Sequence, residues 1–172
     1  MKYFFKSHLA FNLFCFLLFN GSFVWSQEEV TTYYLIRHAE KEKGSSNTKN
    51  PHLSQEGHQR ALKWKTVFSE IDFDQVYSTD FYRTQETVAP TAQEKNIPIT
   101  FYDPRELYNS SFKQNNKGKT VLVVGHSNTT PILANKIIGI QHYPQIEENT
   151  FGKLYILQIH GDTTTHQLLN IE

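Results

Sequence analysis

The chain of 172 residues has a single cysteine, Cys15, which lies in an apolar segment near the N-terminus. A lone cysteine excludes an internal disulfide and a cysteine-rich metal site. The chain also lacks an excess of charge of either sign, because 17 basic residues balance 17 acidic ones. Nucleic-acid-binding proteins usually carry a basic excess, so we expect no nucleic-acid partner.

The N-terminal segment differs from the rest of the chain. Two lysines precede a short apolar run, Leu13–Phe19, and Val24 and Ser26 occupy the −3 and −1 positions of a cleavage site. This order is typical of a secretory signal peptide, and the run is too short for a comfortable membrane span. We therefore predict a signal peptide at 1–26 and one domain at 27–172, which would be periplasmic or extracellular and not stably membrane-associated after cleavage. An uncleaved anchor is the alternative.

The pattern of apolar residues predicts an α/β fold. Short β-branched and aromatic runs alternate with segments of helical periodicity, and the last two runs form a hairpin around Gly161-Asp162. This order implies a three-layer α/β/α sandwich with a mostly parallel sheet and an antiparallel edge. The expected strands are 30–36, 74–78, 97–101, 119–124, 153–160 and 163–171. The expected helices begin at Ser54, at Thr79 or Asp80, and at Ser127 or Asn128.

Charged residues and histidines follow three of the predicted strands. Arg37 and His38 come directly after the first strand, Arg83 lies near the start of the helix after the second, and His126 follows the fourth. In an open α/β sheet, ligands bind in the crevice beyond the carboxyl ends of the strands. An arginine and a histidine at that place offer an anion a fork of donors and an imidazole nucleophile.

Four motifs in this order resemble the histidine phosphatase superfamily, also called phosphoglycerate mutase-like proteins. They are Arg37-His38, Leu53–Gly57, Ser78–Thr87 and Gly125–Ser127. The sequence Arg-His-Ala-Glu-Lys is similar to that of small single-domain members, including the phosphohistidine phosphatase branch. The family's usual glycine is Ala39 here, which we expect to be tolerated if its backbone angle is ordinary.

The resemblance implies a role for each residue of the predicted rim. His38 would attack phosphorus and become a phosphohistidine, while Arg37 and Arg83 would clamp the other phosphoryl oxygens. Guanidinium suits this role because it binds bidentately and keeps its charge. Asn128 and Ser127 are explained equally well by helix capping. The expected phosphate-binding residues are Arg37, Arg83, His126, Ser127 and Asn128.

The leaving group also needs a proton, and many family members supply it from an acidic residue after the third strand. In this sequence that segment offers Glu106 or Asp103, of which we favour Glu106, although some branches have no such acid. The catalytic set expected from the resemblance is thus His38, Arg37, Arg83, His126 and Glu106. We expect no metal and no cofactor, since cationic side chains would stabilise the transferred group.

The sequence therefore predicts an exported phosphatase that hydrolyses small phosphate monoesters or related phosphoryl compounds. A phosphoglycerate-type mutase and a domain that only binds phosphorylated ligands are the alternatives. Lys41, Lys43 and Lys49 could attract an anionic substrate, but a solvated loop accounts for them too. The sequence leaves open the substrate, the oligomeric state and whether residues 102–118 form a lid.

Overall fold

A computed structural model describes residues 29–44, 47 and 49–172. The predicted signal peptide, its cleavage site and Cys15 lie outside these residues. In the part of the chain that the structure describes, no helix is both long and apolar enough to cross a membrane.

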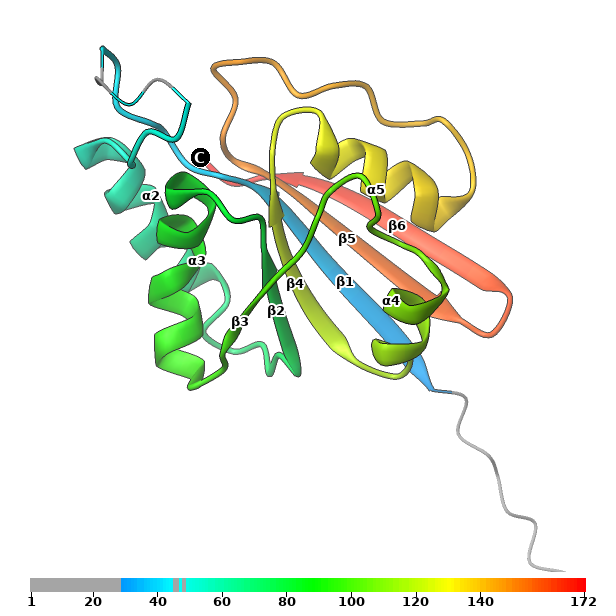
Figure 1. Ribbon diagram of the computed structural model, residues 1–172. Coiled ribbons are helices and arrows are strands. Elements are labelled where there is room, and N and C mark those ends of the chain that lie inside the picture. Colours follow the sequence, from blue (N-terminus) through cyan, green and yellow to red (C-terminus); the bar gives the residue numbers. More distant parts are fainter. Residues whose placement is uncertain (1–28, 45–46, 48) are drawn as a thin grey trace, which may run out of the picture.

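A six-stranded sheet forms the centre of the molecule, with the strand order β3-β2-β4-β1-β5-β6 (Figure 1). The first four strands in this order pair in parallel, and β5 and β6 add an antiparallel edge. The predicted sheet is thereby confirmed, with its hairpin at one edge. The strands are β1 (Val30–Arg37), β2 (Gln75–Ser78), β3 (Ile99–Phe101), β4 (Thr120–Gly125), β5 (Lys153–His160) and β6 (Thr163–Asn170).

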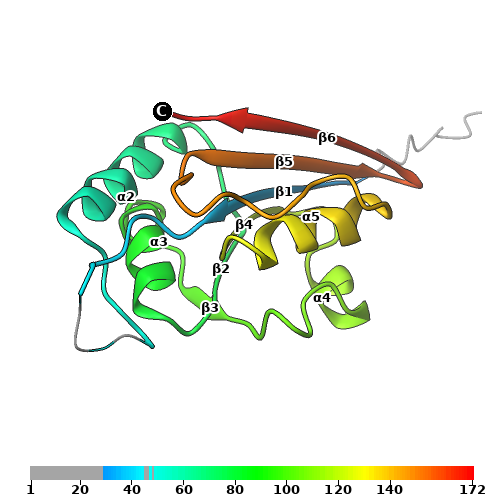
Figure 2. The same ribbon diagram turned by 90° about the horizontal axis from the view of Figure 1, so that it is seen from above.

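Helices cover both faces of the sheet, which gives the predicted three layers (Figure 2). The helices α2 (Gln55–Val67) and α3 (Tyr82–Lys95) lie on one face, and α4 (Ser110–Asn115) and α5 (Thr129–Ile138) lie on the other. Successive residues of a strand point to opposite faces. Leu35 of β1 accordingly belongs to the core under α4 and α5, while Ile36 belongs to the core under α2 and α3.

The helix boundaries agree with the sequence at α2 and differ at α3. Ser54 caps α2 as predicted, because its hydroxyl accepts a hydrogen bond from the Gly57 amide at 3.1 Å. The predicted start of α3 at Thr79 or Asp80 is wrong, since the helix begins at Tyr82. A tight turn precedes it, in which the Phe81 amide donates to the Thr79 carbonyl at 2.9 Å.

Gly57 lets α2 approach the chain that follows β1. A Cβ atom at this position would lie 2.1 Å from the carbonyl oxygen of Glu40, which is far inside contact distance. The Ser54 amide donates to the same carbonyl at 2.9 Å, so the start of α2 and the residue after Ala39 are held together. The glycine of the second motif is therefore a packing requirement.

We expect Gly57→Ala to lower the free energy of unfolding by about 1–3 kcal/mol, because the added methyl group forces backbone apart in a closely packed region. Urea unfolding would measure this change. His58→Ala is the control, because His58 is the next residue of α2 and is exposed. Equal stability of Gly57→Ala and the wild type would show that the close approach does not constrain the fold.

Candidate active site

Three parallel strands end at the same edge of the sheet and bring the predicted residues together. Arg37 is the register partner of Gly125, and Ser78 is the partner of Val124. The amide of His38 continues the ladder by donating to the Gly125 carbonyl at 2.9 Å. Because these strands are neighbours in register, the residues after β1, β2 and β4 must lie around one crevice.

A pocket of about 350 Å³ lies at this edge. It contains every residue of the predicted phosphate site, whereas Glu106 and Asp103 do not line it. Its wall carries two guanidinium groups, two imidazoles and a lysine, so it is strongly suited to an anion. The lining residues are Arg37, His38, Lys41, Arg83, His126, Ser127, Asn128, Gln145, Ile146 and Glu148.

His38 is held in one tautomer by its own loop. Its side chain is buried, and its Nδ1–H donates to the Ala39 carbonyl at 2.7 Å. The other ring nitrogen, Nε2, then carries the lone pair. The Ala39 amide donates to the Thr87 hydroxyl at 2.8 Å, and Ala39 does not have a positive φ. The backbone at Ala39 is thus ordinary, and the departure from the family's glycine is accommodated.

Burial also sets the charge of both imidazoles. It lowers the pKa of His38 to about 3, against the opposing hydrogen bond to Ala39. The positive charges of Arg37 and Arg83, and that of His126 when it is protonated, lower this pKa further. Burial lowers the pKa of His126 to about 4, with further lowering by Arg83 and Arg37. Both rings are therefore neutral near pH 7 in the free protein, so the ring of His38 has a free lone pair without an added base.

His126 is oriented by groups on both sides of its ring. Its centroid lies 5.4 Å from that of His38, and its Nδ1 lies 3.5 Å from an Nη of Arg83. Since guanidinium only donates, Nδ1 is the accepting nitrogen, and Nε2–H donates to the Thr79 hydroxyl at 3.0 Å. Thr84, within 2.9 Å of the Thr79 hydroxyl, extends this buried chain.

Arg37 is fixed by the loop that precedes β5. Its Nη1 lies within 3.0 Å of three carbonyl oxygens, those of Glu147, Glu148 and Thr150. Its guanidinium carbon lies 4.3 Å from the centre of the Phe151 ring, which adds a cation–π contact. Its Nε is buried and has no hydrogen-bond partner in the described residues, so this donor remains available to a bound anion.

Arg83 is held in a similar way on the other side of the pocket. Its guanidinium carbon lies 4.4 Å from the centre of the Phe81 ring. One Nη faces His126, and the other, Nη1, is buried without a partner among the residues that the structure describes. Burial lowers the pKa of both arginines, but guanidinium starts so high that each keeps its charge at neutral pH. The pocket therefore presents two pre-positioned cations.

The two sequence-predicted acids lie elsewhere. Asp103 accepts from the Arg105 Nε at 2.9 Å, and this bond holds the pKa of its carboxyl at about 2. Glu106 is exposed and lines a different hollow with Tyr108 and Lys136. The structure does not bring either carboxylate to the pocket that holds His38, and a catalytic role for Glu106 or Asp103 stays a prediction.

Four lining residues were not expected from the sequence as contacts to phosphate. Lys41 was considered only as a distant attractor, and Gln145, Ile146 and Glu148 belong to the connection between α5 and β5. That connection has no periodicity and no motif. The one sequence signal is Glu147-Glu148, an acidic pair just before β5, and such pairs are usually solvated surface.

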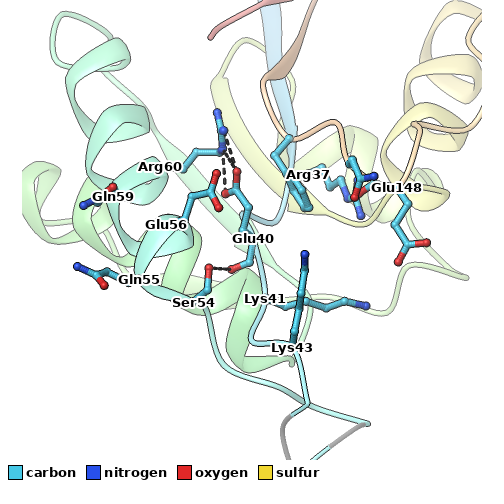
Figure 3. Close-up of a pocket in the computed structure, with 12 residues that line it drawn as sticks. Arg37, Glu40, Lys41, Lys43, Ser54, Gln55, Glu56, Gln59, Arg60 and Glu148 are labelled. Atoms are coloured by element: carbon cyan, nitrogen blue, oxygen red, sulfur yellow. Dashed lines mark hydrogen bonds and ion pairs between the residues drawn. The ribbon is translucent and has the colours of Figure 1, made fainter.

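A larger hollow of about 790 Å³ adjoins this pocket and shares Arg37, Lys41 and Glu148 with it (Figure 3). Its far wall is α2, which presents Glu56 and Gln59. Between the two walls, Glu40 is engaged by Arg60, whose Nε lies 2.7 and 2.9 Å from the carboxylate oxygens. The hollow is polar and open, and it provides room for a group attached to the anion.

Metal-ligating side chains are not grouped in the described part of the chain. Over residues 29–44, 47 and 49–172, no three histidine, cysteine, aspartate or glutamate side chains lie together as a metal-ligand set. The positively charged side chains that line the pocket are those of Arg37, Arg83 and Lys41. The arrangement can bind a tetrahedral oxyanion against the free Nε2 of a neutral imidazole.

We expect the folded protein to lose stability as the pH falls below about 6.5, which is the pKa of a histidine in an unfolded chain. Below this pH, His38 binds a proton in the unfolded chain but stays unprotonated in the folded protein. The loss continues until the pH reaches the folded pKa of His38, about 3. It amounts to at most about 1.4 kcal/mol per pH unit for this residue. Urea unfolding of the wild type and His38→Gln at neutral and acidic pH would measure it. The same pH dependence in both proteins would contradict the neutral buried imidazole.

Comparison with known proteins gives a match to one family model over part of the chain, and a fold. The model of the histidine phosphatase superfamily (branch 1) matches residues 33–104. A search of curated proteins found no match. Solved structures match most of this chain and most of their own length. Their sequence identity to this chain is so low that the likeness shows the fold alone.

Three of these structures represent the group. The protein histidine phosphatase SixA complexed with tungstate has a TM-score of 0.67 and 13% identity, covering 81% of this chain and 96% of its own. The alpha-ribazole phosphatase from Shigella flexneri has a TM-score of 0.62 and 17% identity, covering 81% and 96%. A mycobacterial glucosyl-3-phosphoglycerate phosphatase has a TM-score of 0.61 and 9% identity, covering 82% and 98%. The chain thus matches the model of the histidine phosphatase superfamily over residues 33–104 and shares its fold with these structures.

Proposed function

We propose that this protein is a phosphatase that hydrolyses phosphate monoesters, or related phosphoryl compounds, through a phosphohistidine at His38. The observation that carries the proposal is the pocket itself. It places a neutral imidazole with a free Nε2 beside two guanidinium groups that each keep a buried, unpartnered N–H. A tetrahedral anion satisfies those donors and brings its phosphorus to the nucleophile.

In the first step, the lone pair of His38 Nε2 attacks phosphorus, and the P–O bond to the leaving group breaks. The Nδ1–H of His38 stays on the Ala39 carbonyl, which stabilises the positive charge that develops on the ring. Arg37 and Arg83 hold the remaining phosphoryl oxygens. Water then attacks the phosphohistidine, releases inorganic phosphate and returns the electron pair to Nε2.

The neutral His126 also acquires a function in this sequence. Its Nε2–H is committed to Thr79, so its Nδ1 can donate to the phosphoryl group only after it gains a proton. A phosphoryl dianion beside the ring raises its pKa and favours that uptake. We therefore propose that His126 is neutral in the free enzyme and protonated when the dianion is bound.

The names of the structural relatives support hydrolysis over transfer to a second hydroxyl. SixA, alpha-ribazole phosphatase and glucosyl-3-phosphoglycerate phosphatase are all named as phosphatases. The tungstate bound to SixA is a tetrahedral oxyanion, the shape that this pocket fits. The physiological substrate of this chain would be a small phosphorylated compound whose remainder fits the adjoining hollow.

We expect His38→Ala to abolish the phosphoenzyme and to lower kcat/KM for an aryl phosphate by at least about 1000-fold, because the nucleophile is lost. The reaction with a substrate labelled in its phosphoryl group would be run with a chelator present and quenched in base. Mass spectrometry would then identify the residue that carries the label. His160→Ala is the control, since His160 lies at the far end of β5. Label on another residue, or full turnover by His38→Ala, would contradict the mechanism.

The enzyme is also proposed to act outside the cytoplasm, on the strength of the N-terminal segment. Expression of the full chain in a bacterial host should yield a mature protein that begins near Gln27, because the export machinery removes signal peptides of this type. N-terminal sequencing of the exported fraction would check this. Replacing Leu17 with Arg should leave the precursor inside the cell. A protein that keeps Met1 in the exported fraction would contradict cleavage.

A further inference from the structure

Glu148 stands where the two hollows meet. It is the one carboxylate that lines the anion pocket among the described residues, and it also lines the larger hollow beside it. Figure 3 shows it on the Arg37 side of that hollow, across from Glu56 and Gln59 of α2. If phosphorus lies at His38 and the rest of the substrate lies in the larger hollow, the bridging oxygen between them must cross this junction.

The main chain of Glu148 is anchored to Arg37. Its backbone carbonyl accepts from the Nη1 of Arg37 at 2.8 Å, while its side chain is exposed. Burial lowers the pKa of Arg37, and the negative charge of the Glu148 side chain opposes this lowering. No hydrogen bond or ion pair engages the Glu148 carboxylate in the described part of the chain.

The other nearby carboxylates are less suited to give a proton to a leaving oxygen. Glu40 already accepts from Arg60 on both of its oxygens. Glu56 lines only the larger hollow. Asp103 is paired with Arg105, and Glu106 faces another part of the surface.

We propose that Glu148 is the general acid of the reaction, a role that rests on the proposed phosphatase function. As the P–O bond breaks, its electron pair goes to the bridging oxygen, which takes the proton of the Glu148 carboxyl and leaves as the alcohol. The resulting carboxylate then accepts a proton from the water that attacks the phosphohistidine. Ester and water are thereby converted to alcohol and inorganic phosphate, and Glu148 regains its proton.

The bound substrate is compatible with a neutral carboxyl group at this place, because a phosphoryl dianion repels a second negative charge beside it. Arg37 and Lys41 line the same pocket and attract the dianion.

Substrates that differ in leaving group test this role. A phenolate with electron-withdrawing groups leaves without a proton, whereas an alkoxide requires one. We expect Glu148→Gln to lower kcat/KM for an alkyl phosphate by about 100-fold and to leave that for 4-nitrophenyl phosphate nearly unchanged. Phosphoenzyme formation from 4-nitrophenyl phosphate should also persist, in contrast to His38→Ala.

Two matched variants make the result decisive. Glu147→Gln removes the neighbouring charge and should keep the wild-type ratio of the two substrates. Glu106→Gln tests the rival acid and should keep that ratio too. Equal losses on both substrates in Glu148→Gln, or a selective loss of alkyl phosphate in Glu106→Gln, would overturn the role of Glu148. A wild type without phosphoenzyme or turnover would instead refute the proposed function.

Discussion

The parallel pairing of β1 with β4 is the constraint on which the site depends. Because Arg37 and Gly125 are register partners and the His38 amide continues the ladder, the residues just after the two strands are placed side by side. A slip of one residue would turn the side chains of β1 to the opposite face of the sheet. It would also exchange the cores in which Leu35 and Ile36 are buried. The stability of the sheet and the geometry of the anion pocket are thus set by the same hydrogen bonds.

The electrostatics of the pocket follow from burial and from backbone carbonyls. Arg37 is tied to carbonyl oxygens and an aromatic ring, so it keeps its full charge in a place from which water is largely excluded. Burial, and after it the two arginine charges, make it costly for either imidazole to bind a proton, so both stay neutral. The positive charge comes from groups that cannot lose it, while the proposed nucleophile and the neighbouring imidazole can change their charge when an anion binds. This division suits phosphoryl transfer, which needs a fixed field around a single reactive atom.

The sequence predicted the residues of the site that directly follow strands. It missed those in the connection between α5 and β5, which reach the pocket only in the folded chain. Arg37, His38 and His126 lie at the expected edge of the sheet, because a buried strand ends at or just before each of them. Ser54 caps α2 as predicted, because capping depends only on nearby residues. The start of α3 was misplaced because the turn at Thr79 is held by main-chain and hydroxyl contacts that leave no pattern. The position of the loop before β5 could not be predicted either. Arg37 holds this loop through backbone carbonyl groups, which every residue has and which therefore leave no sequence pattern. Asp103 looked like an available acid only because its pairing with Arg105 could not be seen.

A crystal structure of the protein with orthovanadate or tungstate would test the central claim most directly. We expect one oxyanion in the pocket, with its central atom facing the Nε2 of His38 and its oxygens within hydrogen-bond distance of Arg37, Arg83 and His126. An empty pocket at saturating anion, or an oxyanion bound instead at another basic surface such as that of Arg105 and Lys136, would contradict it.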